Sequence, residues 1–203
     1  MGRILSTLGV LAALVNPAAA EPVRVVALGD SLTAGYNLPR DAAFPVRLEA
    51  ALRKDGLDVR VENAGVSGDT TAGGLARLDW ALGGKPQAVV VELGANDALR
   101  GVDPRQTEAN LDTLLARLKA RGIKVLLAGM KAPPNWGPEY RQAFDGLYSR
   151  LAERHGVLLY PFFLEGVAAV PGLNQDDGIH PTAAGVDEIV RRILPFVKSL
   201  LSR

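Results

Sequence analysis

The amino-acid sequence predicts an α/β protein in three layers, a three-layer α/β/α sandwich with a five-stranded, mainly parallel sheet between two layers of helices. Three observations predict this class: five short apolar runs rich in β-branched residues, a turn after each run, and a helical pattern after each turn. Runs without polar alternation are typical of strands buried on both faces of a parallel sheet. Strands that alternate with helices form sheets covered by helices on both faces.

The expected strands cover residues 23–28, 59–62, 88–93, 123–128 and 157–160. Three segments carry apolar side chains at helical spacing. Their apolar faces are formed by Leu111, Leu114, Leu115 and Leu118, by Tyr140, Phe144, Leu147 and Leu151, and by Val186, Ile189, Val190, Ile193, Val197 and Leu200. Pro195 should kink or interrupt the last helix, because proline lacks a backbone donor and its ring clashes with the preceding turn.

The N-terminal residues 1–20 differ from the rest of the chain. Arg3 is followed by an apolar stretch at 4–15 and by three alanines that end at Ala20. This order is typical of a secretory signal peptide, and the apolar stretch is about half the roughly 20 residues that a spanning helix needs. We therefore expect cleavage near Ala20, a periplasmic or secreted protein and one mature domain at 21–203, with an uncleaved N-terminal anchor as the alternative.

The composition excludes several kinds of chemistry and partner. Of the 203 residues 48% are hydrophobic and none is cysteine, so disulfides, thiolate nucleophiles and Cys-ligated zinc are excluded. Residues 1–20 hold one of the 23 basic residues and none of the 22 acidic ones, so the mature domain carries equal numbers of each. Bulk charge therefore favours neither nucleic acid nor an anionic membrane surface. We expect no stable membrane insertion of the mature chain and a monomer.

Ligands of open α/β sheets bind beyond the carboxyl ends of the strands. Ser31 lies there, directly after the first predicted strand, but serine needs an imidazole to take its proton and a carboxylate to orient that imidazole. His155 precedes Gly156 at the end of a helical pattern, where an imidazole commonly contacts the terminal carbonyls. His180 follows Asp177 by three residues in a polar loop, so this histidine is the candidate base.

The other loops at strand ends offer donors for a negatively charged oxygen. Gly68 leaves its backbone N–H open to close approach, and Asn96 supplies a side-chain amide. Taken singly, Gly68 is typical of a turn and Asn96 of a helix cap. Asp30, beside Ser31, is expected to point away from the serine and to make a local hydrogen bond or cap.

In combination, these segments resemble the SGNH (GDSL) hydrolase superfamily, which is named for a Ser, a Gly, an Asn and a His in separate segments. The matching segments, in the family's order, are Gly29-Asp30-Ser31-Leu32, Gly68, Gly94-Ala95-Asn96-Asp97 and Asp177-Gly178-Ile179-His180-Pro181. The resemblance covers essentially the whole mature chain. It is closest to the bacterial periplasmic thioesterase I/protease I/lysophospholipase and arylesterase branch, although Ala95 replaces a second glycine found in some members.

The resemblance implies a flavodoxin-like SGNH hydrolase fold and a serine esterase that acts through an acyl-enzyme. Ser31 would be the nucleophile, His180 the base and Asp177 its orienter. The Ser31 N–H, the Gly68 N–H and the Asn96 amide would form the oxyanion hole, and no metal or organic cofactor is required. The implied partner is a small-molecule acyl ester, with acyl thioesters and lysophospholipids as further candidates. Activity should fall below about pH 6 to 7, where an ordinary histidine is protonated.

Three alternatives remain open at this stage. An esterase of the same superfamily that acts on O-acetylated carbohydrates would keep the mechanism, an anion-binding module would use residues 29–35 to cradle a phosphate, and Asp176, Asp177 and His180 could bind a metal. Apolar residues near strand ends are expected to line an acyl groove. These residues are Leu32, Pro133, Pro134, Trp136, Phe163 and the loop 167–173.

Overall fold

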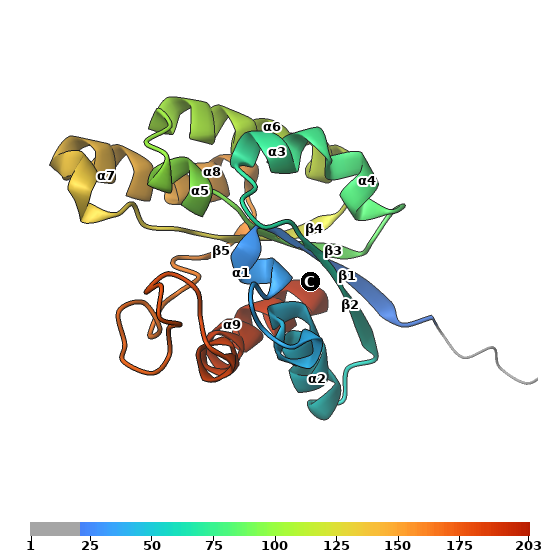
Figure 1. Cartoon of the computed structure of the whole chain (residues 1–203). Coiled ribbons are helices and arrows are strands. Elements are labelled where there is room, and N and C mark those ends of the chain that lie inside the picture. The colour runs from blue at the N-terminus through green and yellow to red at the C-terminus, as the bar shows by residue number, and fades with distance from the viewer. Residues whose placement is uncertain (1–20) are drawn as a thin grey trace, which may run out of the picture.

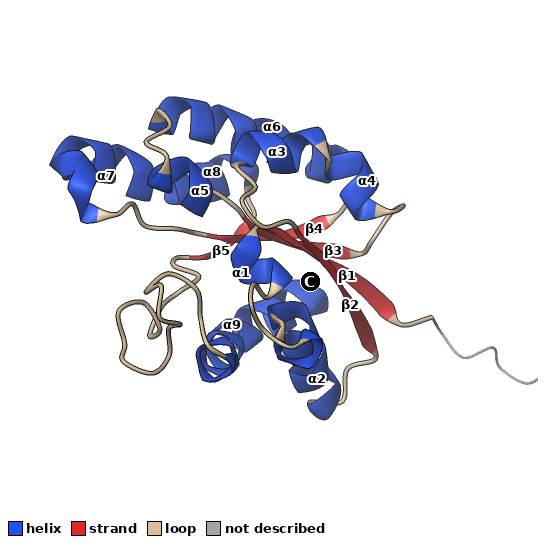
Figure 2. Cartoon of the chain, viewed as in Figure 1, coloured by secondary structure: helices blue, strands red, loops and turns tan. Residues whose placement is uncertain are grey.

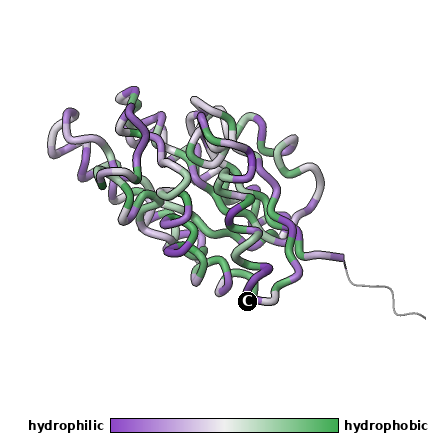
Figure 3. Tube along the Cα trace, turned by 60° about the horizontal axis from the view of Figure 1, so that its bottom comes forward, coloured by the Kyte–Doolittle hydropathy of each residue, from purple (hydrophilic) through white to green (hydrophobic). Residues whose placement is uncertain are grey.

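The computed structural model describes residues 21–203, so the predicted signal peptide and its cleavage site lie outside the described residues. A central sheet separates two layers of helices (Figure 1), which confirms the predicted three-layer α/β/α class. The strands form the thin middle layer (Figure 2), and hydrophobic stretches run through the middle of the domain (Figure 3). No helix within residues 21–203 is long and apolar enough to span a membrane.

All five predicted runs are strands, and every neighbouring pair in the sheet is parallel. The strands are β1 (Val23–Gly29), β2 (Val59–Gly65), β3 (Ala88–Glu92), β4 (Lys124–Ala128) and β5 (Leu158–Tyr160). Their order is β2-β1-β3-β4-β5, so the chain reverses direction across the sheet between β1 and β3. A crevice opens at such a switch point beyond the carboxyl ends of the strands. The segments that follow β1 and β3, which begin short helices and hold Ser31 and Asn96, border this crevice.

Helices cover both faces of the sheet (Figure 1). On one face lie α2 (Phe44–Lys54) and α9 (Ala183–Ser202), which pack against each other. The other face carries α3 (Thr71–Ala76), α4 (Leu78–Leu82), α5 (Ala95–Leu99), α6 (Pro104–Ala120), α7 (Gly137–Asp145) and α8 (Leu147–His155). The apolar residues predicted for α6 are all buried, which confirms that helical face.

Pro195 was predicted to kink or interrupt the last helix; an interruption is wrong, because α9 runs continuously from Ala183 to Ser202 with Pro195 inside it. A proline inside a helix costs about 3 kcal/mol or more. Residues on both sides of it, including Ile193 and Val197, are fully buried. Burial of one such side chain contributes about 1.5 to 3 kcal/mol, so the packed face of α9 outweighs the lost backbone hydrogen bond.

Candidate active site

The turn from β1 into the short helix α1 (Ser31–Ala34) presents Ser31 at the carboxyl edge of the sheet. Asp30 is the N-cap of α1, and its Oδ1 accepts the Leu32 N–H at 3.0 Å, which confirms its expected capping role. Gly29 is required by close packing, since a Cβ there would lie 2.1 Å from Thr33 Oγ1 and 2.5 Å from Glu92 Oε2. Ser31 therefore begins a helix whose position is fixed by the close packing around Gly29.

Ser31, His180 and Asp177 form one chain of hydrogen bonds. Ser31 Oγ lies 2.9 Å from His180 Nε2, and His180 Nδ1 lies 2.7 Å from Asp177 Oδ2. Because a carboxylate only accepts, the Nδ1 proton faces Asp177 and leaves Nε2 free to accept the serine proton. The structure thus brings these three predicted residues together across 149 positions of sequence.

Backbone N–H groups hold Asp177, the carboxylate of this hydrogen-bond chain, in place. Asp177 Oδ1 accepts the N–H groups of Ile179 at 2.9 Å and of His180 at 3.0 Å. The hydrogen bonds from the His180 backbone and side chain, with that from Ile179, lower the pKa of Asp177 from 3.8 to about 2. Asp177 therefore remains ionised wherever an ordinary histidine titrates.

Sequence reasoning missed the contacts that hold the histidine loop in place. The Tyr36 ring lies against the His180 imidazole with centroids 4.3 Å apart. Gln175 donates from its side chain to the carbonyls of Tyr36 at 3.0 Å and Pro181 at 2.9 Å, and accepts from Asn37 at 3.1 Å. These residues join the loop before α9 to the loop after α1. Their only signal in the sequence was their closeness to Ser31 and His180.

The predicted oxyanion donors are placed differently. Asn96, the second residue of α5, lines the cavity beside Ser31, and its Nδ2 donates to Asp30 Oδ2 at 3.0 Å. Gly68 lies in the loop after β2 with a φ of 84°, and its carbonyl accepts from Arg100. It does not border the cavity that Ser31 and Asn96 line, so the structure places Asn96 in the site and leaves the role of Gly68 a prediction.

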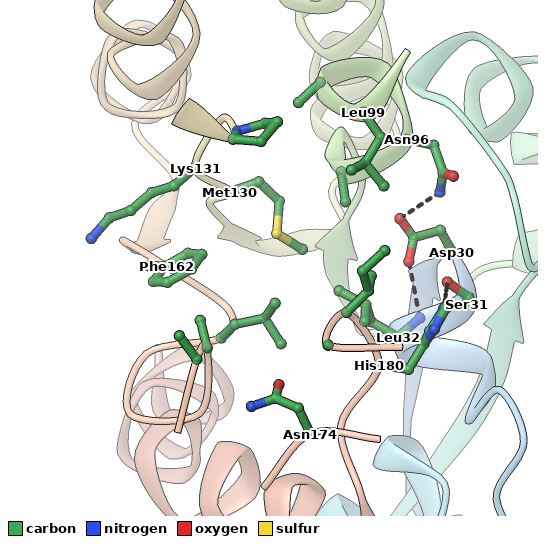
Figure 4. Close-up of a pocket in the computed structure, with 18 of the residues that line it drawn as sticks. Asp30, Ser31, Leu32, Asn96, Leu99, Met130, Lys131, Phe162, Asn174 and His180 are labelled. Carbon is green, nitrogen blue, oxygen red and sulfur yellow. Dashed lines mark hydrogen bonds between the residues drawn. The ribbon is translucent and has the colours of Figure 1, made fainter. Parts of the chain in front are cut away.

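A cavity of about 410 Å³ opens beside Ser31 and His180 (Figure 4). Its volume lies in the range of about 300 to 1,000 Å³ typical of small-molecule sites. The predicted lining residues Leu32, Pro133 and Pro134 border it, as do Ala168 and Ala169 from the loop 167–173. Sequence reasoning missed a further set of lining residues from α5, from the loop after β4 and from the segment between β5 and α9: Ala98, Leu99, Met130, Lys131, Phe162, Leu164 and Ile179.

Two predicted groove residues are wrong. Phe163 is fully buried and packs edge-on against Phe44, with centroids 5.0 Å apart, while its neighbour Phe162 borders the cavity. Trp136 donates from Nε1 to the Ala98 carbonyl at 2.7 Å and rests its ring against Gly101. Phe162 and Phe163 are neighbours in the loop after β5, so a shift of one residue exchanges core for cavity.

The second histidine takes no part in this site. Gly156 adopts the predicted left-handed cap after α8. The His155 ring, however, lies 2.9 Å from Asp112 Oδ1, so the expected contact with terminal carbonyls is replaced by a carboxylate. Within residues 21–203, no group of three His, Cys, Asp or Glu residues is arranged to hold a metal ion, so Asp176, Asp177 and His180 do not form one.

Comparisons with known proteins place this chain in a family. Residues 27–187 match the family described as GDSL-like Lipase/Acylhydrolase. The chain is 44% identical over 199 residues to Esterase TesA of Pseudomonas aeruginosa, which covers 98% of both chains. It is also 44% identical over 184 residues to Thioesterase 1/protease 1/lysophospholipase L1 of Escherichia coli K12, covering 88% of this chain and 87% of the other.

Solved structures agree. The crystal structure of TesA has a TM-score of 0.83 at 44% identity and covers 87% of this chain and 99% of the other. The psychrotrophic esterase EstA from Pseudoalteromonas sp., in a structure inhibited by monoethylphosphonate, has a TM-score of 0.84 at 31% identity, covering 89% and 100%. The chain belongs to the GDSL-like lipase/acylhydrolase family, and with it to the carboxylic ester hydrolases.

Proposed function

We propose that this protein hydrolyses acyl esters by nucleophilic catalysis, with Ser31 as nucleophile, His180 as general base and Asp177 as its orienter. The observation that carries this proposal is the continuous Ser31–His180–Asp177 hydrogen-bond chain at the edge of an apolar cavity. A nucleophile, a base within hydrogen-bond reach and a third group that orients the base are the parts this chemistry needs. The reaction requires no cofactor, and we propose that the mature chain acts as a monomer.

The reaction takes two steps. His180 Nε2 accepts the Ser31 proton while Oγ attacks the ester carbonyl, and the oxyanion receives hydrogen bonds from the Ser31 N–H, the Gly68 N–H and the Asn96 amide. The intermediate collapses to an acyl-serine, and His180 returns the proton to the departing alcohol or thiol. Water then attacks the acyl-serine with His180 again as base, which releases the acid and restores Ser31.

The cavity lining favours an acyl chain as the part of the substrate that lies beside Ser31. Leu32, Leu99, Met130, Phe162 and Ile179 give it a largely apolar wall. An O-acetylated sugar would need many hydrogen-bonding side chains there, since each buried hydroxyl without a partner is costly. The names of the relatives support aryl esters, acyl thioesters and lysophospholipids as candidate substrates.

The proposal is tested by replacing Ser31 with alanine and measuring hydrolysis of p-nitrophenyl octanoate and p-nitrophenyl acetate. Loss of a catalytic serine lowers kcat by about 10⁴-fold or more. The control is Ser149→Ala, which removes an exposed serine hydroxyl on α8 and should leave kcat unchanged. An ethyl phosphonate ester should add covalently to the wild type and to Ser149→Ala but not to Ser31→Ala, as read by mass spectrometry. Full turnover by Ser31→Ala contradicts the mechanism, and a strong preference for acetate favours the carbohydrate esterase.

The sequence pattern of residues 1–20 further supports export to the periplasm or the cell exterior with cleavage near Ala20. Expression of the full chain in a Gram-negative host should give an extracytoplasmic protein that begins at Glu21. A protein that retains residue 1 and stays in the cytoplasm would contradict export.

A further inference from the structure

Two carboxyl groups lie buried beneath the nucleophile, and the proposed mechanism uses neither. Asp30 caps the helix that carries Ser31, and Glu92 ends the central strand β3. Both are fully buried, at 0% exposure. Glu92 is a lone charged residue in an otherwise apolar strand, and burial of an unpaired carboxylate is expensive. The pair therefore needs a physical explanation.

Each of the two carboxyls accepts hydrogen bonds from residues nearby. Glu92 Oε2 accepts the Thr33 hydroxyl at 2.7 Å and the Asp30 backbone N–H at 3.3 Å. Glu92 Oε1 has no hydrogen-bond partner within the described part of the chain. Asp30 accepts two donors, the Leu32 N–H at 3.0 Å and the Asn96 amide at 3.0 Å (Figure 4). Asp30 therefore has the stabilising donors that an ionised carboxylate needs, and Glu92 has fewer.

Burial first, and then the charge of Asp30, raise the pKa of Glu92 well above its ordinary value. Burial also raises the pKa of Asp30 to about 6, although the hydrogen bonds from Leu32 and Asn96 and the charge of His180 partly offset this rise. Two carboxyls in one dry site cannot both ionise at low cost, so one of them keeps a proton. The donors around Asp30 favour its ionised form and leave the proton on Glu92.

We infer that Glu92 and Asp30 share a single proton in the working enzyme, and that Glu92 is thereby a positioning residue for the Asn96 amide. A protonated Glu92 donates to Asp30, and the Asp30 carboxylate accepts from Asn96 Nδ2. Because an ionised carboxylate can only accept hydrogen bonds, the NH₂ end of the amide, and not its carbonyl oxygen, must face Asp30. The second N–H of Asn96 remains free to point into the cavity, where the oxyanion forms.

Other charged and titratable groups surround the pair. The His180 imidazole lowers the pKa of Asp30 through its charge. Arg77 donates to the Gly29 carbonyl at 2.9 Å and pairs with Asp69 at 2.5 Å. The remaining nearby groups are Asp97, which accepts from Thr71, and the Tyr148 hydroxyl, which donates to the Leu93 carbonyl. Neither carboxyl of the pair forms a salt bridge with lysine or arginine within residues 21–203.

The shared proton is tested by infrared spectroscopy of the folded protein, without reference to activity. A protonated carboxyl has a carbonyl stretch that an ionised one lacks. The wild type should show this band at neutral pH, and the band should grow as the pH falls through about 6, when Asp30 takes up a second proton. Glu92→Gln should lose the band at neutral pH, and the control Glu165→Gln, on the surface, should keep it. Absence of the band in the wild type at neutral pH overturns the inference.

The positioning role is tested by comparing Glu92→Gln with Glu92→Met. Glutamine can donate to Asp30 and accept from Thr33, whereas methionine has a similar length and can do neither. Glu92→Gln should keep kcat within about threefold, and Glu92→Met should lose about tenfold or more in kcat with KM nearly unchanged, because the Asn96 donor acts on the transition state. Equal kcat values for the two variants, at folded fractions matched by circular dichroism, overturn the role.

This second test rests on the proposed function, whereas the infrared test does not. If Ser31→Ala keeps full activity, the proposed function fails, and the band still decides whether the proton is shared. If Ser31→Ala is inactive and the band is absent, the inference about Glu92 fails alone.

Discussion

The molecule contains two histidine–aspartate pairs of nearly equal geometry, and only one of them lies in a site. His180 Nδ1 lies 2.7 Å from Asp177, and His155 Nε2 lies 2.9 Å from Asp112. Both aspartates have a lowered pKa, because hydrogen bonds to their ionised form favour it. A short His–Asp contact with an ionised carboxylate is therefore not sufficient evidence of catalysis.

The two pairs differ in what surrounds the imidazole. His180 has Ser31 at its other ring nitrogen, an apolar cavity beside it and a place at the carboxyl edge of the sheet. His155 ends α8 shortly before β5 begins, at the opposite edge, and Asp112 there also binds Arg154 at 2.8 Å. The second pair thus ties α8 to α6. The comparison teaches that the nucleophile and the cavity, rather than the dyad, define the site.

The largest expected difference comes from replacing each histidine with glutamine. His180→Gln removes the base and should lower kcat for p-nitrophenyl octanoate by about 10⁴-fold or more. His155→Gln should leave kcat unchanged, because His155 does not line the cavity beside Ser31 and its ring contacts Asp112 on a neighbouring helix. Steady-state kinetics at a single pH decide the matter. Comparable losses in the two variants would break the distinction drawn between the pairs.

The aspartates should show the same contrast at a smaller magnitude. Asp177→Asn preserves shape but favours the wrong imidazole tautomer, and the corresponding change in another serine hydrolase lowers kcat by about 10⁴-fold. Asp112→Asn should leave kcat unchanged and cost at most about 1 kcal/mol of unfolding free energy, as exposed ion pairs do. Kinetics and urea denaturation measure the two effects. Unchanged turnover by Asp177→Asn would remove Asp177 from the mechanism.

The chemistry of the site could be predicted from the sequence because each part has a local signature. Ser31 follows an apolar strand, and His180 and Asp177 are three residues apart, so their pairing needs only a single turn of backbone. The strands were also visible as apolar runs, although β2, at an edge of the sheet, alternates apolar and polar residues. Residue type and spacing therefore carry the dyad and the sheet.

The parts that could not be predicted depend on side-chain direction and on burial. Phe162 and Phe163 are chemically identical neighbours, and only the packing of the loop after β5 decides which one borders the cavity. The expectation that Pro195 interrupts a helix comes from a local rule, and the packing of α9 overrides that rule. Glu92 was not singled out because it lies in an apolar run. A single acid after three valines was nevertheless a signal that the end of this strand lies near the site.

Asn96 offers a third way to sharpen the comparison, because no amide donor serves His155 in a similar manner. Asn96→Ala should lower kcat by about 10² to 10³-fold with little change in KM, since an oxyanion donor acts in the transition state. Asn110→Ala removes an amide that donates to Thr71 at 3.0 Å and should leave kcat unchanged. Initial-rate kinetics on both variants test this. A rise in KM alone for Asn96→Ala would indicate substrate binding in place of oxyanion stabilisation.

The smallest expected difference lies in acid stability, where the two pairs should behave alike. A carboxyl whose pKa is lowered on folding stabilises the folded protein at any pH above the carboxyl's ordinary pKa. That stability is lost as the pH falls through the folded pKa. For Asp177 the window runs from 3.8 down to about 2. Asp177 and Asp112 are 39% and 38% exposed, so solvent screens both pairs, and each Asn variant should lower Tm at neutral pH by at most about 4 °C. Thermal denaturation should show both differences vanish near the lower end of this window. A Tm difference that persists at the lower end of this window would mean that packing of the replaced side chain, and not its charge, accounts for the lost stability.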